Sequence, residues 1–306
     1  MNVFLLRGIR LLRLCVFVYA GKMRAITLYV GLAFAFSSVF YALIIASGHV
    51  GGGNGYYATG LDWSPAAAAL LTCTLLRIDI GTIGWRWRPW RWQILAYATP
   101  LLFCLIGYVA VWATGLGGFP NGKTVDSLKA ALGIPSLSTS QVIVLWTLLL
   151  LITGAGSMAT ALGEEIGWRG FLSPRLAERY GFTRAAFITG AVWATWHFPI
   201  LFFADFDSAS PVWFTLPCFV IDLLGLSVIM LWLRLCSGSV WTGALVHASF
   251  NLWNQQFFTP LTAPRGAITN YTIDESGFML PIVISITAYL FWRKRAAVLP
   301  AERVLS

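Results

Sequence analysis

Charged residues are scarce in this sequence. Asp, Glu, Lys and Arg make up 11% of its 306 residues, whereas hydrophobic residues make up 58%. Soluble domains carry about 25% charged residues, so the composition excludes water as the main solvent of this chain. The mean hydropathy of +0.74 agrees with this conclusion. We therefore expect most of the chain to lie in a lipid bilayer, with membrane lipids as its main contacts.

Acidic residues are fewer than basic ones, and the formal net charge is +9. Such a balance also occurs in proteins that bind nucleic acids. Here, however, Lys and Arg gather beside the ends of apolar runs, where the positive-inside rule places them. We therefore expect no nucleic-acid partner.

The sequence also lacks a cysteine motif. Its five cysteines are scattered and show no metal-ligand spacing, so we expect them to be reduced packing residues. They are Cys15, Cys73, Cys104, Cys218 and Cys236.

Long apolar runs recur along the chain. A helix of about 18 or more apolar residues crosses roughly 30 Å of hydrocarbon, and the runs lack the alternation of barrel strands. The sequence therefore predicts an all-α fold, a polytopic membrane bundle of about eight transmembrane helices. The expected spans are about 25–47, 64–83, 93–115, 141–168, 184–203, 212–233, 240–257 and 277–292. A short surface helix is expected within 123–133.

The two ends of the chain are basic. Arg7, Arg10 and Arg13 lie among leucines and isoleucines, which predicts an amphipathic helix on the cytoplasmic leaflet. An even number of spans then places both termini in the cytoplasm, and a bacterial-type inner membrane is the expected location. In one domain we distinguish the basic N-terminal segment 1–24, the N-terminal helices 25–139, a catalytic core 140–257, and the last span with a basic tail 258–306.

Three polar motifs lie at membrane depth, where an ionisable group costs at least ~2.5–3.5 kcal/mol. The first contains Glu164, Glu165 and Arg169. Glu165 and Arg169 are four residues apart, so they can form an ion pair on one helix face. Glu164 then lies about 100° away and is left to face a cavity. The alternative is a cytoplasmic helix end with a solvated salt bridge.

The other two motifs contain histidines. His197 lies one turn after Trp193 in an aromatic segment, and His247 lies one turn before Asn251. The alternatives are a hydrogen-bonded structural histidine in the first case and an interhelical hydrogen-bond pair in the second. Such a pair contributes about 0.6 kcal/mol.

Depth along the helices connects the three motifs. A hairpin turning near Gly181 places Glu164, 17 residues before it, level with His197, 16 residues after it; both lie about 25 Å from the turn. His247 lies nine residues after a second turn at Gly238, or about 14 Å deep. If the first hairpin projects about 10 Å into the cytoplasm, all groups share one depth. The predicted pocket contains Glu164, His197, His247 and Asn251.

Such a pocket suits hydrolysis. A carboxylate and a histidine can activate water as a general base, and a second histidine with an asparagine can stabilise an oxyanion. There is no HExxH motif and no Ser-His-Asp spacing. Glu164, His197 and His247 could equally bind Zn²⁺ as three ligands with an open water position. The sequence leaves both mechanisms open.

The three motifs in this order resemble the CPBP family, also called ABI, which comprises CAAX-processing proteases and bacteriocin-processing or immunity relatives. The resemblance covers roughly 140–255. It implies that Glu164 and His197 activate water, that His247 and Asn251 stabilise the oxyanion, and that Glu165 with Arg169 is structural. Trp193 stands where the family usually has Phe, and it keeps an aromatic wall.

The resemblance implies an intramembrane endopeptidase, either a zinc metalloprotease or a metal-free glutamate protease. Its substrate would be a peptide or protein, with a lipid-modified CAAX terminus as one option. Two alternatives are a non-enzymatic immunity or scaffold factor and a proton-coupled transporter. The complete motif set disfavours the first, and the lack of an inverted repeat disfavours the second. Asp222 could pair with a site histidine, line a water path or bond to a neighbouring helix.

Overall fold

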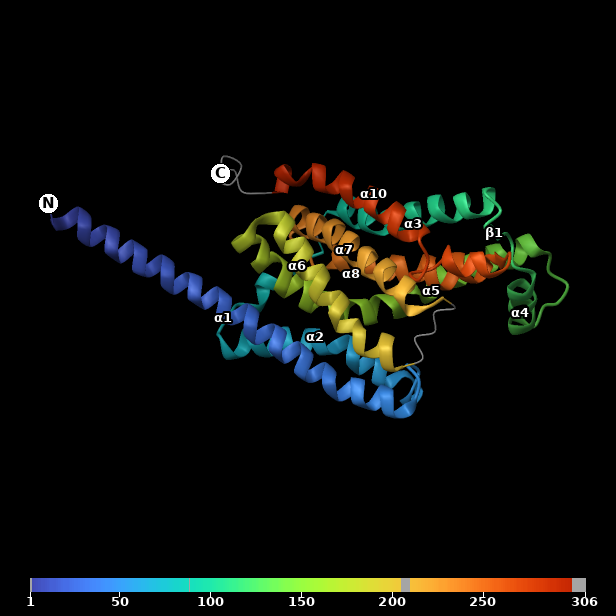
Figure 1. Cartoon of the computed structure of the whole chain (residues 1–306), viewed down its shortest axis with the longest axis horizontal. Coiled ribbons are helices and arrows are strands. Elements are labelled where there is room, and N and C mark those ends of the chain that lie inside the picture. Colours follow the sequence, from blue (N-terminus) through green and yellow to red (C-terminus); the bar gives the residue numbers. More distant parts are fainter. Residues whose placement is uncertain (1, 88, 205–209, 299–306) are drawn as a thin grey trace.

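The chain folds into a bundle of roughly lengthwise helices (Figure 1). The computed structural model describes the backbone of residues 2–87, 89–204 and 210–298, and within these ranges the side chains from residue 21 onward except that of residue 155. The α-helices are α1 (Asn2–Ser47), α2 (Tyr56–Leu75), α3 (Trp90–Ala113), α4 (Gly122–Leu132), α5 (Thr139–Glu165), α6 (Ser173–Phe203), α7 (Val212–Ser237), α8 (Trp241–Asn251), α9 (Thr259–Leu261) and α10 (Met279–Arg293).

Shorter elements connect these helices. The π-helical segments η3 (Ile166–Leu172) and η4 (Leu252–Phe258) directly continue α5 and α8. The 3-10 turns are η1 (Gly53–Gly55), η2 (Ile80–Ile83), η5 (Ala267–Tyr271) and η6 (Arg295–Val298). The described strands are β1 (Gly117–Gly118) and β2 (Ala263–Pro264), two residues each, which pair antiparallel. The predicted all-α fold class is confirmed.

Most of the expected helices are present with nearly the expected bounds. The spans expected at 93–115, 212–233 and 277–292 correspond to α3, α7 and α10. The expected surface helix is α4, and the span at 240–257 is α8 continued by η4. The first 24 residues and the first span form one continuous helix, α1, from Asn2 onward. The amphipathic side chains expected within 1–20, and Cys15 among them, lie outside the described side chains.

The expected second span, 64–83, was wrong in its bounds. Helix α2 begins eight residues earlier, at Tyr56, and ends at Leu75. Arg77 follows it with a φ of 52°, a left-handed conformation that stops the helix. Asp79 caps the next turn, because its Oδ1 accepts a hydrogen bond of 2.8 Å from the Gly81 amide. Neither charge therefore interrupts a membrane helix.

The predicted count of eight spans is not confirmed. Among the described residues, four helical stretches are long and apolar enough to cross a membrane, and Thr139–Gly154 and Met279–Arg293 are shorter apolar helices. The four stretches are Gly21–Ser47, Trp90–Ala113, Gly156–Phe203 and Val212–Ser237. The third of these includes the break at Gly181, whose φ of 76° and ψ of 173° divide α6 into two helices. The turn expected there is confirmed.

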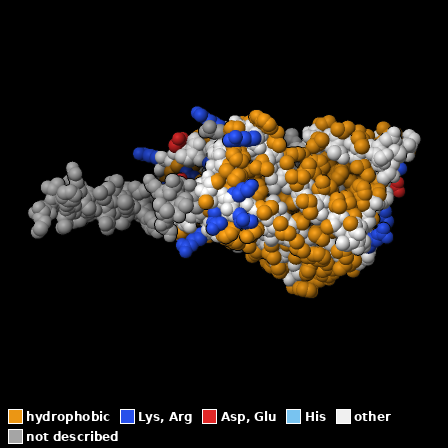
Figure 2. All heavy atoms as spheres, turned by 90° about the horizontal axis from the view of Figure 1, so that it is seen from above, with side chains coloured by type: hydrophobic (Ala, Val, Ile, Leu, Met, Phe, Trp, Pro, Cys, Tyr) orange, Lys and Arg blue, Asp and Glu red, His pale blue; other side chains and the backbone are white. Residues whose placement is uncertain are grey.

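One end of the bundle is basic. Lys22 of α1 and Trp292 of α10 contact Glu178 and Thr183, on either side of the Gly181 turn. Figure 2 shows Lys and Arg side chains gathered mainly toward one end of an otherwise largely apolar surface. This distribution fits a chain whose body faces lipid and whose basic end lies at headgroup level.

The core is built around tryptophans. Trp168, Trp193 and Trp196 are almost fully buried, with exposures of 0%, 1% and 1%. Trp168 and Trp196 pack edge to face with ring centroids 6.0 Å apart, a preferred geometry for aromatic pairs. Cys73, Cys104 and Cys218 are buried free thiols, and Cys236 is a half-buried one. They are packing residues, as predicted.

Small residues bring α2 against the end of α5. A Cβ atom at Gly163 would lie 2.7 Å from the Asp62 carbonyl oxygen, and one at Gly167 would lie 2.8 Å from that of Pro65. These contacts are shorter than a packed side chain allows, so α2 approaches the end of α5 and η3 through backbone atoms. Small residues serve the same purpose at many interfaces between membrane helices.

Gly167→Ala should therefore destabilise the protein. The added methyl group meets the backbone of Pro65, which cannot rotate away, and overpacking of this kind costs about 1–3 kcal/mol. The melting temperature of the purified protein in detergent should fall. Gly156→Ala is the matched control, because a Cβ atom there meets nothing within 4 Å. Equal melting temperatures for the two variants would contradict the proposed close approach.

Candidate functional site

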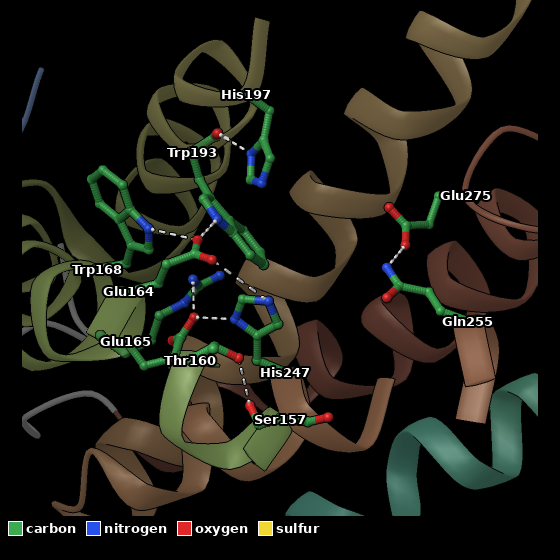
Figure 3. A network of polar contacts seen from close by, with 11 residues as sticks. Ser157, Thr160, Glu164, Glu165, Trp168, Trp193, His197, His247, Gln255 and Glu275 are labelled. Atoms are coloured by element: carbon green, nitrogen blue, oxygen red, sulfur yellow. Dashed lines mark hydrogen bonds and ion pairs between the residues drawn. The ribbon is translucent and has the colours of Figure 1, made fainter. Parts of the chain in front are cut away.

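The three predicted motifs meet in the interior of the bundle (Figure 3). Glu164 and Glu165 are the last residues of α5, immediately before the π segment η3. His247 lies on α8, whose last residue, Asn251, immediately precedes the second π segment, η4. π turns inside helices occur frequently at functional sites. Both motifs on α5 and α8 therefore end where the helix changes its winding.

Glu164 is held by two indole groups. Its Oε2 accepts hydrogen bonds from Trp193 Nε1 at 2.7 Å and from Trp168 Nε1 at 3.3 Å. Its Oε1 lies 3.9 Å from His247 Nε2. The side chain is 7% exposed. The sequence analysis left Glu164 to face a cavity; in the structure, one of its carboxylate oxygens is fixed by indole groups and the other faces a histidine.

Glu165 and Arg169 form the predicted ion pair. Arg169 Nη1 donates to Glu165 Oε1 at 2.9 Å, and both side chains are fully buried. The same oxygen accepts a hydrogen bond from His247 Nδ1 at 3.2 Å. Arg169 Nη2 donates to Ser227 Oγ on α7. The pair therefore connects α5, η3, α7 and α8, and its burial excludes the alternative of a solvated helix end.

His197 is oriented by the backbone of its own helix. Its Nδ1 lies 3.0 Å from the Trp193 carbonyl oxygen. A carbonyl oxygen only accepts, so Nδ1 carries the proton and Nε2 keeps a lone pair. Nε2 has no hydrogen-bond partner among the described residues. His197 therefore presents an unprotonated ring nitrogen, one turn after the tryptophan that holds Glu164.

Asn251 follows His247 by one turn on α8. It is half-buried, and its side chain has no hydrogen-bond partner in the described part of the chain. The amide is therefore available to a substrate. Its predicted role at an oxyanion stays a prediction.

Asp222 makes neither of the two side-chain contacts considered for it. It is 1% exposed, and neither carboxylate oxygen has a hydrogen-bond partner among the described residues. It therefore neither pairs with a site histidine nor bonds to a neighbouring helix in this structure. We assign it no role.

The sequence analysis missed several polar neighbours of the site. Trp168 was detectable, since it lies four residues after Glu164 and thus on the same face. Gln255 was also detectable at two turns from His247, and it donates to Glu275. Ser157 accepts from Gln256 Nε2 at 3.2 Å and lies on α5, seven residues before Glu164. Glu275 and Asp62 gave no signal, because neither belongs to a spaced motif; Asp62 interacts electrostatically with Glu164 and His247.

The described residues do not form a zinc site of the expected kind. His247 Nε2 and Glu164 Oε1 could share an ion, since two ligands each about 2.1 Å from a metal lie within about 4 Å of each other. No group of three or more His, Cys, Asp or Glu side chains is placed to hold a metal in the described part of the chain. The expected ligand set of Glu164, His197 and His247 therefore does not fit here.

Comparisons with known proteins concern the same region. Residues 140–253 match the model of a family described as type II CAAX prenyl endopeptidase Rce1-like. A curated relative, CAAX prenyl protease 2 of Methanococcus maripaludis, is 29% identical over 198 residues, covering 62% of this chain. The match spans 65% of that relative, just under two thirds of its length. Both findings confirm the resemblance to the CPBP and CAAX protease family that the three motifs indicated.

Glu165→Ala should destabilise the protein strongly. It leaves the Arg169 guanidinium buried without its counter-charge, and breaking a buried pair in this way costs about 3–5 kcal/mol. The melting temperature and the yield of folded protein should both fall. The double variant Glu165→Met/Arg169→Met removes both charges and should recover part of the loss. An unchanged melting curve for Glu165→Ala would exclude the structural role.

Glu275, in the loop before α10, should make stability depend on pH. Burial, together with the neighbouring Asp274 carboxylate, raises the pKa of Glu275 from 4.5 to about 7. Between these values the folded state holds a proton that the unfolded chain has lost, so stability falls as pH rises from about 4.5 to 7. The melting temperature should decrease across this window, and Glu275→Gln should flatten the profile. Asp126→Asn, at an exposed carboxylate on α4, is the control. Equal slopes for the wild type and Glu275→Gln would contradict the assignment.

Proposed function

We propose that this chain, whose region 140–253 matches the CAAX prenyl endopeptidase family, is an intramembrane endopeptidase. Its substrate would be a peptide or protein with a lipid-modified, CAAX-type C-terminus. The observation that supports this most is the buried group of Glu164, Trp193 and His247. One carboxylate oxygen of Glu164 accepts a hydrogen bond from Trp193, and the other faces His247. A solely structural carboxylate would have no need of this asymmetry.

The first step is the activation of water. Glu164 Oε1 accepts a proton from a water molecule that also contacts His197 Nε2, the nitrogen whose lone pair is free. The water attacks the carbonyl carbon of the scissile peptide bond as its proton moves to the base. General-base assistance of this kind contributes about 10²–10⁴ in rate. The proton then passes to the nitrogen of the departing amine.

The oxyanion of the tetrahedral intermediate needs donors. Asn251 supplies its side-chain amide, which has no partner within the described protein. His247 already donates from Nδ1 to Glu165, so a hydrogen bond from Nε2 requires the imidazolium form. The carboxylates of Glu164 and Glu165 on either side provide the counter-charges for that cation. Removing one such donor typically costs about 10²–10³ in rate.

This mechanism uses no metal. Protein side chains accept or donate every proton that this mechanism moves. A hydrogen bond from Arg169 orients Glu165, and a hydrogen bond from Trp193 orients Glu164. We therefore propose the glutamate mechanism rather than the zinc mechanism. We also propose that the basic end of the bundle faces the cytoplasm, with both termini on that side of a bacterial-type inner membrane.

The second candidate function is a non-enzymatic immunity or scaffold factor that has kept the fold. It shares the family's helices but requires no working base. The free Nε2 of His197 and the free amide of Asn251 favour the enzyme, because a packing role would pair both groups. Activity of the purified protein distinguishes the two functions.

Glu164→Ala and His247→Ala should each lower peptidase activity at least about hundredfold, since each removes a group that acts on the reacting atoms. The assay uses detergent-solubilised protein with a prenylated CAAX peptide and, in parallel, a mixed peptide library. Asp126→Ala, an exposed acidic position on α4, should leave activity unchanged. Full activity in either site variant would exclude the proposed mechanism. If a zinc chelator abolished the activity of the wild type, the zinc mechanism would be favoured instead.

A further inference from the structure

A polar cavity lies at the basic end of the bundle, at the start of α6 and apart from the catalytic motifs. Its volume is about 490 Å³, and it is bordered by the start of the membrane-spanning part of α1, the segment after α2, η2 and the start of α6. Cavities of about 300–1,000 Å³ are typical of ligand sites. The proposed peptidase mechanism uses none of its lining residues.

The residues that line the cavity are of two kinds, charged and apolar. Lys22, Arg24 and Arg175 provide three cations, and Glu178 provides a single anion. Leu76 and Ile78 provide an apolar wall next to them. A ligand that satisfies both must carry a negatively charged head and a hydrocarbon part. We propose that this cavity binds the phosphate headgroup of an anionic phospholipid, with the start of its acyl chains against Leu76 and Ile78.

The side chain of Arg175 is already oriented by protein contacts before such a ligand binds. Its Nη1 donates to the Phe171 carbonyl oxygen at 2.9 Å and its Nη2 to Thr82 Oγ1 at 3.0 Å. Its guanidinium carbon also lies 3.9 Å from the centre of the Phe171 ring. Each terminal nitrogen keeps a second N–H, so the fixed fork can still donate to a phosphate. Little side-chain entropy is lost on binding, because Arg175 is already ordered.

The other two cations are available as well. Arg24 is exposed and has no ion-pair or hydrogen-bond partner within the described part of the chain. Lys22 pairs with Glu178 at 2.8 Å, but their side chains are 46% and 57% exposed. Exposed pairs of this kind contribute about 0–1 kcal/mol, so a phosphate can take the place of Glu178 as the partner of Lys22.

The position of the cavity identifies the source of the phosphate as a lipid. The apolar stretch of α1 that is long enough to cross a membrane begins at Gly21, which itself borders the cavity. The cavity thus lies where a membrane helix enters the headgroup layer. Basic pockets between membrane helices at this depth bind anionic headgroups. A bound headgroup would also link α1 to the start of α6, where Arg175 lies three residues after the end of η3.

The test is a lipid titration of the full-length protein in detergent, read as melting temperature. Phosphatidylglycerol should raise the melting temperature with saturation, because it binds the folded state. Phosphatidylcholine, which has the same chains and no net charge, and inorganic phosphate should both have little effect. A rise of equal size with phosphatidylcholine or with phosphate alone would overturn the proposal. The readout involves no peptidase activity, so its failure is distinct from failure of the proposed function.

Two substitutions that change the charge of the cavity in opposite directions should shift its affinity for phosphatidylglycerol in opposite directions. One charge near an anionic headgroup changes the half-saturating phosphatidylglycerol concentration about fivefold. Arg24→Gln should raise this concentration about fivefold, and Glu178→Gln should lower it by a similar factor. Arg293→Gln, an exposed cation at the end of α10 outside the cavity, should leave it unchanged. An equal loss in Arg293→Gln and Arg24→Gln would show general charge attraction and would contradict a specific site.

Discussion

The contact on which the site depends is the buried pair of Arg169 and Glu165, because a charge without a partner cannot persist in the interior of a membrane protein. Arg169 satisfies this requirement through several neighbours at once. It donates to Glu165 and Ser227, and its guanidinium lies 4.1 Å from the centre of the Trp193 ring. Its backbone carbonyl accepts from Arg234 Nε on α7. Four helical elements are thereby fixed relative to one cation.

The positions of the reacting groups follow from this pair. Glu165 Oε1 is oriented by Arg169, and the same oxygen orients His247. Trp193 stacks with Arg169 on one side and donates its indole N–H to Glu164 on the other. His247 therefore contacts the ion pair directly, and Glu164 is connected to it through Trp193. A phenylalanine at position 193 would preserve the stacking but not the hydrogen bond to Glu164.

Much of the fold could be predicted because long apolar runs specify membrane helices almost directly. The bounds of α3, α7 and α10 differ from their predictions by only a few residues. Helix α2 was misplaced because its first half contains Gly60, Asp62 and Pro65, which weaken the apolar signal, and because its end depends on a left-handed Arg77. The predicted number of spans is not confirmed, since α2 and α8 are not among the described helices that are long and apolar enough to cross a membrane.

The site was predictable only in part. The spacing of four residues predicted the Glu165–Arg169 pair. The positions along the helices predicted that Glu164, His197 and His247 lie at the same depth in the membrane. Neither argument gives the direction in which a side chain points around its helix. The hydrogen bonds from His247 to Glu165 and from Trp193 to Glu164 join different helices, depend on that direction and were therefore missed. Glu275 reaches Gln255 from a loop, where no periodicity exists to predict it.

The two π segments have a consequence for how this sequence can change. A π turn holds one residue more than an α turn, so deleting a single residue from η3 or η4 could restore continuous α-helix without breaking the chain's path. Residues beyond the deletion would then keep nearly their present orientation, because the π turn accommodates the extra residue. A deletion in the regular part of α5 or α8 would instead rotate everything beyond it by about 100° about the helix axis. The two seven-residue π segments are therefore the places where these helices can lose one residue without turning the elements beyond them away from their neighbours.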